Sequence, residues 1–171
     1  MLRAVFGLTL LAVVGFGGPT AAQQTFVDPF AYCDAKITVE APGAEWQGPA
    51  VPETILRGLR QRAQLGDAMP DQQLAQQTHW RCMQRQVYAC FVGANLPCME
   101  KGDADRTPTT AMNDFCKEHP GIDFIPAATT GRATIYQWQC NGQEAQATGK
   151  LYNVDPAGFI REFWYPISPS G

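Results

Sequence analysis

The clearest pattern of apolar and polar positions is a helical one in the first half of the chain. Pro52 and Glu53 suit the first turn of a helix, and Gly66 is a stop signal. Between them the apolar residues recur three or four positions apart, so they share one face of a helix. That face consists of Ile55, Leu56, Leu59 and Ala63. The pattern predicts a helix that buries these side chains.

A second helix is predicted later in the chain, with Thr107 as its N-cap and Pro108 at its first position. His119 and the Pro-Gly pair after it end this helix. Its expected buried stripe consists of Ala111, Met112, Phe115 and Cys116. The polar stretch 71–77 is compatible with either a short helix or a loop.

Other segments alternate apolar and polar residues, which is typical of strands. A loop at 83–86 predicts one hairpin, and Asn141-Gly142, a strong two-residue turn signal, predicts another. The pattern predicts an α+β fold: a small antiparallel sheet of β-hairpins with two helices packed on it, stapled by disulfides. The predicted strands span 36–40, 79–82, 87–92, 133–140, 143–148 and 159–165.

The start of the chain has the three parts of a secretory signal: Arg3, an apolar run at 4–16, and small residues at 20–22. The alternative is a membrane anchor, but a span needs about 20 apolar residues, and Gly-Gly-Pro interrupts this run. We predict a signal peptide at 1–22 and a single domain at 23–171. The mature protein is expected to be periplasmic or secreted, with no membrane insertion.

All six cysteines lie after the predicted signal. An even number in an exported chain is typical of disulfides, whereas zinc favours closely spaced cysteine pairs, and no C-x-x-C occurs. The layout along the chain favours three pairings: Cys82–Cys90, Cys98–Cys116 and Cys33–Cys140. Six cysteines allow about 15 sets of pairings, so the sequence leaves the connectivity open.

A short motif, W-x-C, occurs at Trp80-Arg81-Cys82 and 58 residues later at Trp138-Gln139-Cys140. Side chains two apart in a strand share a face, and an indole packed on a buried disulfide is a common core arrangement. The motif therefore predicts two equivalent corners of the core. The alternative is a duplicated ligand site.

Composition and motifs exclude several functions. Without the signal the chain has 12 basic and 16 acidic residues, a net charge of −4, so it has no electrostatic reason to bind nucleic acid or an anionic membrane. Arg57, Arg60 and Arg62 are compatible with an anion site but are more typical of a solvated helix face. His79 and His119 lack partners nearby in the sequence. No nucleophile, phosphate-loop or calcium-loop motif occurs, so we predict no catalytic residue, metal or cofactor.

The segment from Gly93 to Lys101 is the best candidate for a binding loop. Glycine, asparagine and proline restrict its backbone, and a disulfide at Cys98 clamps one end. Such a rigid loop presents apolar side chains to a partner. The candidate binding residues are Asn95, Leu96, Pro97 and Met99. The alternative is an ordinary turn that packs its leucine on the core.

Two strings, W-R-C…V-Y-A-C-F-V-G-A-N-L-P-C and I-Y-Q-W-Q-C-N-G, resemble a set of small exported bacterial proteins without an assigned activity. A looser resemblance is to periplasmic lysozyme inhibitors, which are small, disulfide-bearing and rich in β-structure and carry Y-x-C before an acidic or glycine turn. Here Trp138 stands in place of that tyrosine. The first resemblance implies a stand-alone exported domain, and the second implies an inhibitor.

Three functions follow. The first is a non-catalytic binding or accessory module, including an inhibitor, that acts on a protein partner in the periplasm. The second is a hydrolase of cell-wall or glycan material, which needs two carboxylates facing each other across a cleft. The third is a structural subunit of a larger exported complex. An apolar patch around Leu96 favours the first. The candidate carboxylates for the second are Asp103, Asp105, Asp114, Glu118, Asp123 and Glu162.

Overall fold

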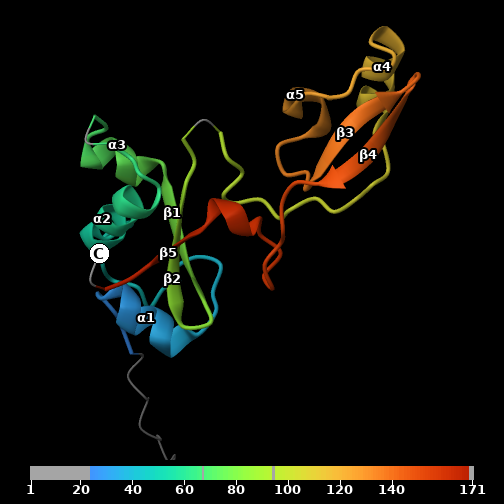
Figure 1. The fold of residues 1–171 in the computed structure, drawn as a ribbon. Coiled ribbons are helices and arrows are strands. Elements are labelled where there is room, and N and C mark those ends of the chain that lie inside the picture. The colour runs from blue at the N-terminus through green and yellow to red at the C-terminus, as the bar shows by residue number, and fades with distance from the viewer. Residues whose placement is uncertain (1–23, 67, 94, 170–171) are drawn as a thin grey trace, which may run out of the picture.

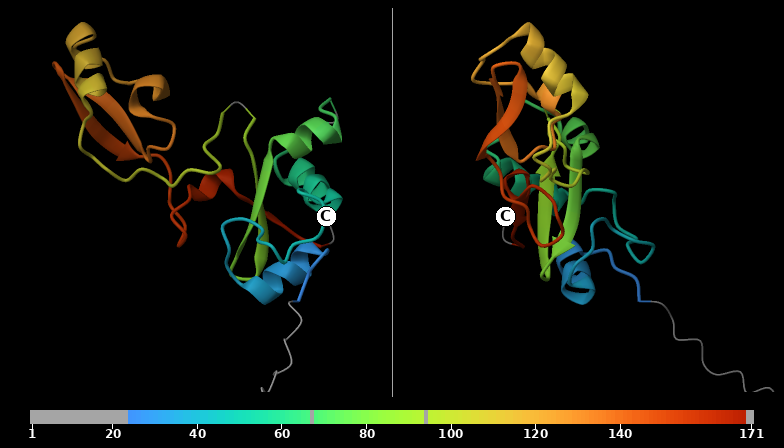
Figure 2. Two further views of the ribbon diagram at one scale, coloured as in Figure 1. Left: turned by 180° about the vertical axis from the view of Figure 1, so that it is seen from behind. Right: turned by 90° about the vertical axis from the view of Figure 1, so that its right-hand side faces the viewer.

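The structure is a computed structural model that describes residues 24–66, 68–93 and 95–169. The chain forms two parts (Figures 1 and 2). The N-terminal part contains the first three helices, the first hairpin and the last strand of the chain. The C-terminal part contains the two later α-helices and the second hairpin, and two connecting segments join it to the N-terminal part. The predicted signal peptide, 1–22, lies outside the described residues. Within the described ranges, none of the helices has the length and apolar character that crossing a bilayer requires.

The elements form two antiparallel sheets in the described part of the chain, β1-β2-β5 and β3-β4. Within the described residues, five α-helices accompany these sheets, together with three disulfides. The α+β class with packed helices and disulfides is confirmed, although the two hairpins lie in separate sheets. The helices are α1 (Pro29–Lys36), α2 (Glu53–Arg62), α3 (Asp71–Gln76), α4 (Thr110–Glu118), α5 (Ala127–Thr130) and the 3-10 helix η1 (Arg161–Phe163). The strands are β1 (Thr78–Met83), β2 (Gln86–Phe91), β3 (Tyr136–Asn141), β4 (Glu144–Lys150) and β5 (Tyr165–Ile167).

Both predicted helices form. In α2 the predicted face is buried except for its last residue, Ala63, which follows the helix and is half-buried. In α4 the N-cap is Thr109, whose side chain accepts the Met112 N–H at 3.2 Å. The helix therefore begins two residues later than predicted. It points Met112 and Cys116 at the β3-β4 hairpin, and this orientation turns Ala111 to solvent.

The predicted strand at 36–40 is wrong. A helix, α1, precedes it because the Asp28 carboxylate accepts the Ala31 N–H at 2.8 Å and caps the first turn. Lys36 is the last residue of this helix. Only Val39 pairs with a strand, as an isolated antiparallel bridge to β1.

The hairpin turns are tighter than predicted, or shifted. In the first hairpin the turn has two residues, Gln84 and Arg85, with φ of 52° and 69°. Positive φ at both central residues is the signature of a type I′ turn. In the second, Asn141 pairs with Glu144, so Gly142 leads the turn. The predicted strand at 159–165 is wrong, since η1 occupies its centre and β5 continues beyond it to pair with β2.

The predicted number of disulfides, three, is confirmed, but every predicted pairing is wrong. In the β1-β2 register Cys82 lies opposite Val87 and Cys90 lies opposite His79, so the two cysteines sit at different ends of the hairpin. A disulfide needs Cα atoms within about 7 Å, which this register prevents. The observed pairs are Cys33–Cys82, Cys90–Cys98 and Cys116–Cys140.

The two parts contain the same helix–hairpin unit. In each, an aromatic residue and a cysteine lie next to each other in a helix: Tyr32-Cys33 in α1 and Phe115-Cys116 in α4. This cysteine bonds to the cysteine of W-x-C in the first strand of the hairpin. Both tryptophans and all four cysteines are buried, so the prediction of two equivalent core corners is confirmed.

The segment after each helix is also equivalent, and we call it the edge segment (37–42 and 120–125). Val39 and Ile122 each come six residues after the helix cysteine. The carbonyl of Val39 accepts the Cys82 N–H at 3.0 Å, and the carbonyl of Ile122 accepts the Cys140 N–H at 2.8 Å. Each edge segment therefore lies along the W-x-C strand of its own unit.

The described core has three clusters: one in the N-terminal part, one in the C-terminal part, and one around Cys90, Cys98, Phe159 and Trp164. The third contains a buried ion pair between Arg81 of β1 and Asp155. The guanidinium lies 4.4 Å from the Phe159 ring centroid and 4.3 Å from that of Trp164. We call the residues between β4 and β5 (151–164) the returning segment. The ion pair connects this segment to the first hairpin.

We expect Gly58→Ala to lower the free energy of unfolding by about 1–3 kcal/mol. A Cβ at this position in α2 would lie 2.7 Å from Ile167 Cγ2, a contact that only a shift of the buried Ile167 side chain or of β5 can relieve. Gly149→Ala is the matched control, because a Cβ there meets nothing within 4 Å. Urea denaturation of both variants tests this, and equal stabilities would contradict the close packing of α2 on β5.

Candidate binding site

The predicted binding loop is attached to the end of β2. The Cys90–Cys98 disulfide closes it, and the Leu96 N–H donates to the Val92 carbonyl at 2.8 Å. Asn95 has a φ of 73°, a left-handed conformation that asparagine tolerates better than most residues. The clamp predicted at Cys98 is therefore present, although its partner is Cys90.

The structure distributes the four predicted binding residues over two hollows. Asn95, Leu96 and Pro97 line one of them, which also involves the C-terminal part of the chain. Met99 lines the other, beside β1. Pro97 is buried, whereas Leu96 is 37 % and Met99 is 54 % exposed. The loop therefore presents its two large apolar side chains to different places.

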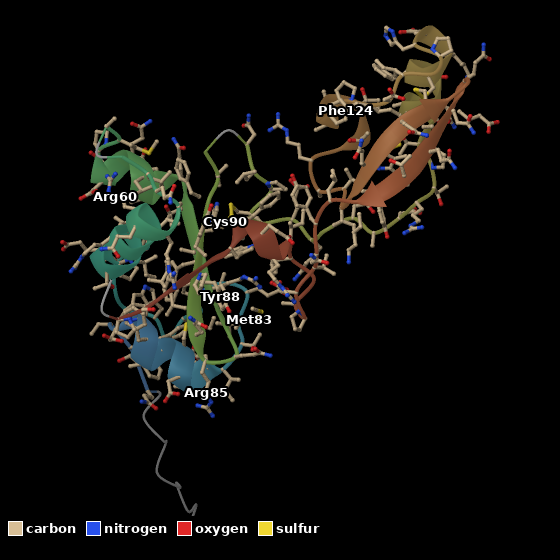
Figure 3. All side chains as sticks on the ribbon, in the orientation of Figure 1. Arg60, Met83, Arg85, Tyr88, Cys90 and Phe124 are labelled. Atoms are coloured by element: carbon tan, nitrogen blue, oxygen red, sulfur yellow. A yellow bond between two sulfur atoms is a disulfide. The ribbon has the colours of Figure 1, made fainter. Side chains whose placement is uncertain are left out.

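The first hollow, which we call the C-terminal hollow, has a volume of about 330 Å³. Phe124 and Leu151 line this hollow and are 55 % and 49 % exposed. Figure 3 shows Phe124 in the C-terminal part of the molecule, near α5. The other aromatic walls are Tyr136, Trp138, Tyr152 and Phe163. Exposed apolar side chains gathered around a hollow are typical of an interaction site.

Among the described residues that line the C-terminal hollow, Arg132 is the one with a charged side chain, and two tyrosines also line it. An Arg132 Nη atom donates to the Asn95 carbonyl at 3.4 Å, and no described carboxylate forms an ion pair with this guanidinium. No described aspartate, glutamate or histidine lines the hollow. These walls can hold an apolar group and a negative charge.

The second hollow, which we call the N-terminal hollow, has a volume of about 360 Å³. Trp80, Met99 and Pro42 contribute to its walls. His79 also lines it, and burial lowers the pKa of this imidazole, which favours the neutral ring. Glu40 at the rim forms an ion pair with a lysine, Lys101.

The carboxylates proposed for the hydrolase alternative do not converge on either hollow. Hydrogen bonds from the Thr107 backbone and side chain lower the pKa of Asp105. Burial opposes the shift at Glu162, yet hydrogen bonds from Asn153 lower the pKa of this carboxyl too. A glycosidase acid needs a raised pKa. In the described ranges, no three residues among His, Cys, Asp and Glu are placed to hold a metal ion.

Two of the three arginines of α2, Arg60 and Arg62, have structural contacts. Arg60, labelled in Figure 3, donates to the Asp71 carboxylate with its Nε at 3.1 Å and to the Gly66 carbonyl with an Nη at 2.9 Å. It therefore holds the connection between α2 and α3. Arg62 donates to the Pro166 carbonyl of β5 at 3.3 Å.

Phe124, Leu151, Tyr152 and Phe163 were not among the predicted binding residues. Phe124 begins an apolar stretch after the second predicted helix. The one sequence signal for its exposure is the neighbouring charged residue, Asp123. Comparison with known proteins adds no further residue: no family model matches the chain, and neither a curated protein nor a solved structure is similar to it. The resemblance to small exported bacterial proteins and to lysozyme inhibitors stays a prediction.

Proposed function

We propose that this protein is a non-catalytic exported binding module that holds apolar side chains of a protein partner in the C-terminal hollow. The observation that carries the proposal is the convergence of exposed Leu96, Phe124 and Leu151 on one hollow. These three side chains come from segments far apart in the sequence.

The rigidity of the walls supports this proposal. The disulfide at Cys98 fixes the loop, and the Cys116–Cys140 disulfide fixes β3 to α4. The Trp138 indole N–H donates to Thr134 Oγ1 at 3.0 Å, which fixes the floor of the hollow. A preformed site loses little conformational entropy when it binds.

Inhibition of a wall-degrading enzyme is one form of this function. An inhibitor needs a rigid surface and no chemistry of its own. The disulfides beside the hollow support the first condition. The second agrees with the described lining residues, among which there is no carboxylate or histidine. The hydrolase alternative lacks such support, because the candidate carboxylates do not line the C-terminal hollow.

Co-purification tests the proposal. The tagged, oxidised mature chain is expressed in its native cells, and bound proteins are identified by mass spectrometry. We expect a stoichiometric partner that survives moderate salt. The purified partner should bind a Phe124→Asp variant at least about 10-fold more weakly than the unaltered protein, since truncating an interface anchor costs about 2 kcal/mol of binding free energy.

Val27→Asp is the matched control, because Val27 is an apolar residue with 72 % exposure that lines neither hollow. Its affinity for the partner should equal that of the unaltered protein. Equal binding by all three proteins would contradict the site, and a chain that purifies without a partner would contradict the function.

A further inference from the structure

The two hollows lie at equivalent places in the two helix–hairpin units. The residues that lead into W-x-C line both of them. Trp80 lines the N-terminal hollow and Trp138 lines the C-terminal one. The two positions before each tryptophan also correspond: Thr78 and His79 in one hollow, and Tyr136 and Gln137 in the other.

The edge segments supply a second equivalent wall. Ala41 and Pro42 line the N-terminal hollow, and Phe124 and Ile125 line the C-terminal hollow. These pairs are 83 residues apart, which is also the separation of the two helix cysteines, Cys33 and Cys116. Five residues that line one hollow therefore occupy positions equivalent to five residues that line the other.

We propose that the N-terminal hollow is a second binding site of the same kind, and that one extended segment of the partner fills both hollows with two apolar side chains. This inference rests on the proposed function. It adds that the protein is bivalent, with one site in each repeated unit.

The loop between the hollows indicates how one segment reaches both. Leu96 lines the C-terminal hollow and Met99 lines the N-terminal hollow. They are three residues apart, so their Cα atoms are at most about 11 Å apart. An extended partner segment advances about 3.3 Å per residue. Because Leu96 and Met99 belong to one short loop and border different hollows, an extended segment that crosses this loop can place one apolar side chain in each hollow.

Charge distinguishes the two ends of such a segment. Arg132 lines the C-terminal hollow without a described ion-pair partner. The charged group at the N-terminal hollow, Glu40, already pairs with Lys101. The partner segment should therefore carry a carboxylate beside the side chain that enters the C-terminal hollow. The occupant is an extended protein segment with two apolar side chains and one adjacent acidic residue.

The tryptophans give each hollow its own reporter. The Trp80 indole N–H donates to the Ala50 carbonyl at 2.8 Å, and that of Trp138 donates to Thr134 Oγ1 at 3.0 Å. The two indole N–H groups should therefore give separate signals in a ¹H–¹⁵N spectrum of the oxidised mature chain. The probe is N-phenyl-1-naphthylamine, an uncharged apolar molecule.

We expect the probe to shift both indole signals and to saturate at two molecules per chain. Phe124→Asp should abolish the shift of Trp138 and leave that of Trp80, and Met99→Asp should do the reverse. Both altered residues are largely exposed, so these variants should fold.

A shift of Trp138 alone would overturn the second site and leave the proposed function intact. Shifts of neither indole would overturn both. If the probe shifts both indole signals and Met99→Asp leaves the shift of Trp80 unchanged, the second site would also be overturned. Once the partner is purified, Met99→Asp should weaken its binding about 10-fold, and a Met99→Asp/Phe124→Asp double variant should lose more than either single variant. An unaltered affinity for Met99→Asp would contradict the bivalent arrangement.

Discussion

Replacing Asp155 with alanine is expected to lower the free energy of unfolding by about 3–5 kcal/mol, because it leaves a buried charge without its partner. The side chains of Arg81 and Asp155 are each only 1 % exposed. In the described structure Nε and one Nη of Arg81 already have no hydrogen-bond partner. The carboxylate also accepts the N–H groups of Ala157 and Phe159, so its removal loosens the returning segment as well.

A double variant separates the charge from the packing. Arg81→Met/Asp155→Asn removes both charges but keeps a flexible apolar side chain between the Phe159 and Trp164 rings. It should be clearly more stable than Asp155→Ala in urea denaturation at pH 7. If the single and double variants were equally destabilised, packing and not the uncompensated charge would explain the loss.

The second large effect concerns the disulfides. Replacing Cys33 and Cys82 with alanine should cost about 4 kcal/mol, because this disulfide closes a loop with a sequence separation of 49. The shorter loops should cost less: about 3.5 kcal/mol for a separation of 24 and about 2.5 kcal/mol for a separation of 8. The order follows from the entropy that each cross-link removes from the unfolded chain.

Denaturant titration of the three double-alanine variants gives this order directly. The predicted single domain over 23–171 requires one cooperative transition in each case. The controls are the corresponding single alanine variants, which should be at least as unstable as the doubles. A larger loss for the Cys90–Cys98 variant than for the Cys33–Cys82 variant would contradict the entropic account.

The sequence predicts α2 and both hairpins because their signals are local. The α2 face repeats at helical spacing, and Asn141-Gly142 marks a turn to within one residue. The strand predicted at 36–40 fails because α1 continues to Lys36 and Ile37 then has a φ of 64°, which is incompatible with an extended strand. Alternation over five residues is too short a signal to exclude this. Similarly, η1 displaces the last strand, because the N–H groups of Phe163 and Trp164 donate to the nearby carbonyls of Ile160 and Arg161 and not to a neighbouring strand.

Disulfide connectivity depends on which segments meet in space, and spacing along the chain does not show this. One overlooked signal does: Tyr32-Cys33 and Phe115-Cys116 are each followed, six positions after the cysteine, by a β-branched residue. Each unit also contains one W-x-C motif, so equivalent units should join the helix cysteine to the cysteine of their own W-x-C. Cys90 and Cys98 then remain for each other, as the structure has them.

The candidate site could be predicted only in part. A constrained loop with Leu96 at its tip is visible in the sequence, because glycine, asparagine and proline restrict the backbone. The exposure of Phe124 is not, because an apolar residue after a helix is equally compatible with burial in the core. Tyr152 and Phe163 join the hollow through the fold of the returning segment, which no local pattern determines.

Photo-crosslinking from position 124 tests the central claim most directly. Phe124 is replaced with p-benzoyl-phenylalanine in the full chain, and Val27 is replaced in the same way as a control. Irradiation of the native cells should join position 124 to one partner protein, and Leu96→Asp should abolish the product, while position 27 gives none. Absence of a crosslink at 124, or the same products from both positions, would contradict a binding site at the C-terminal hollow.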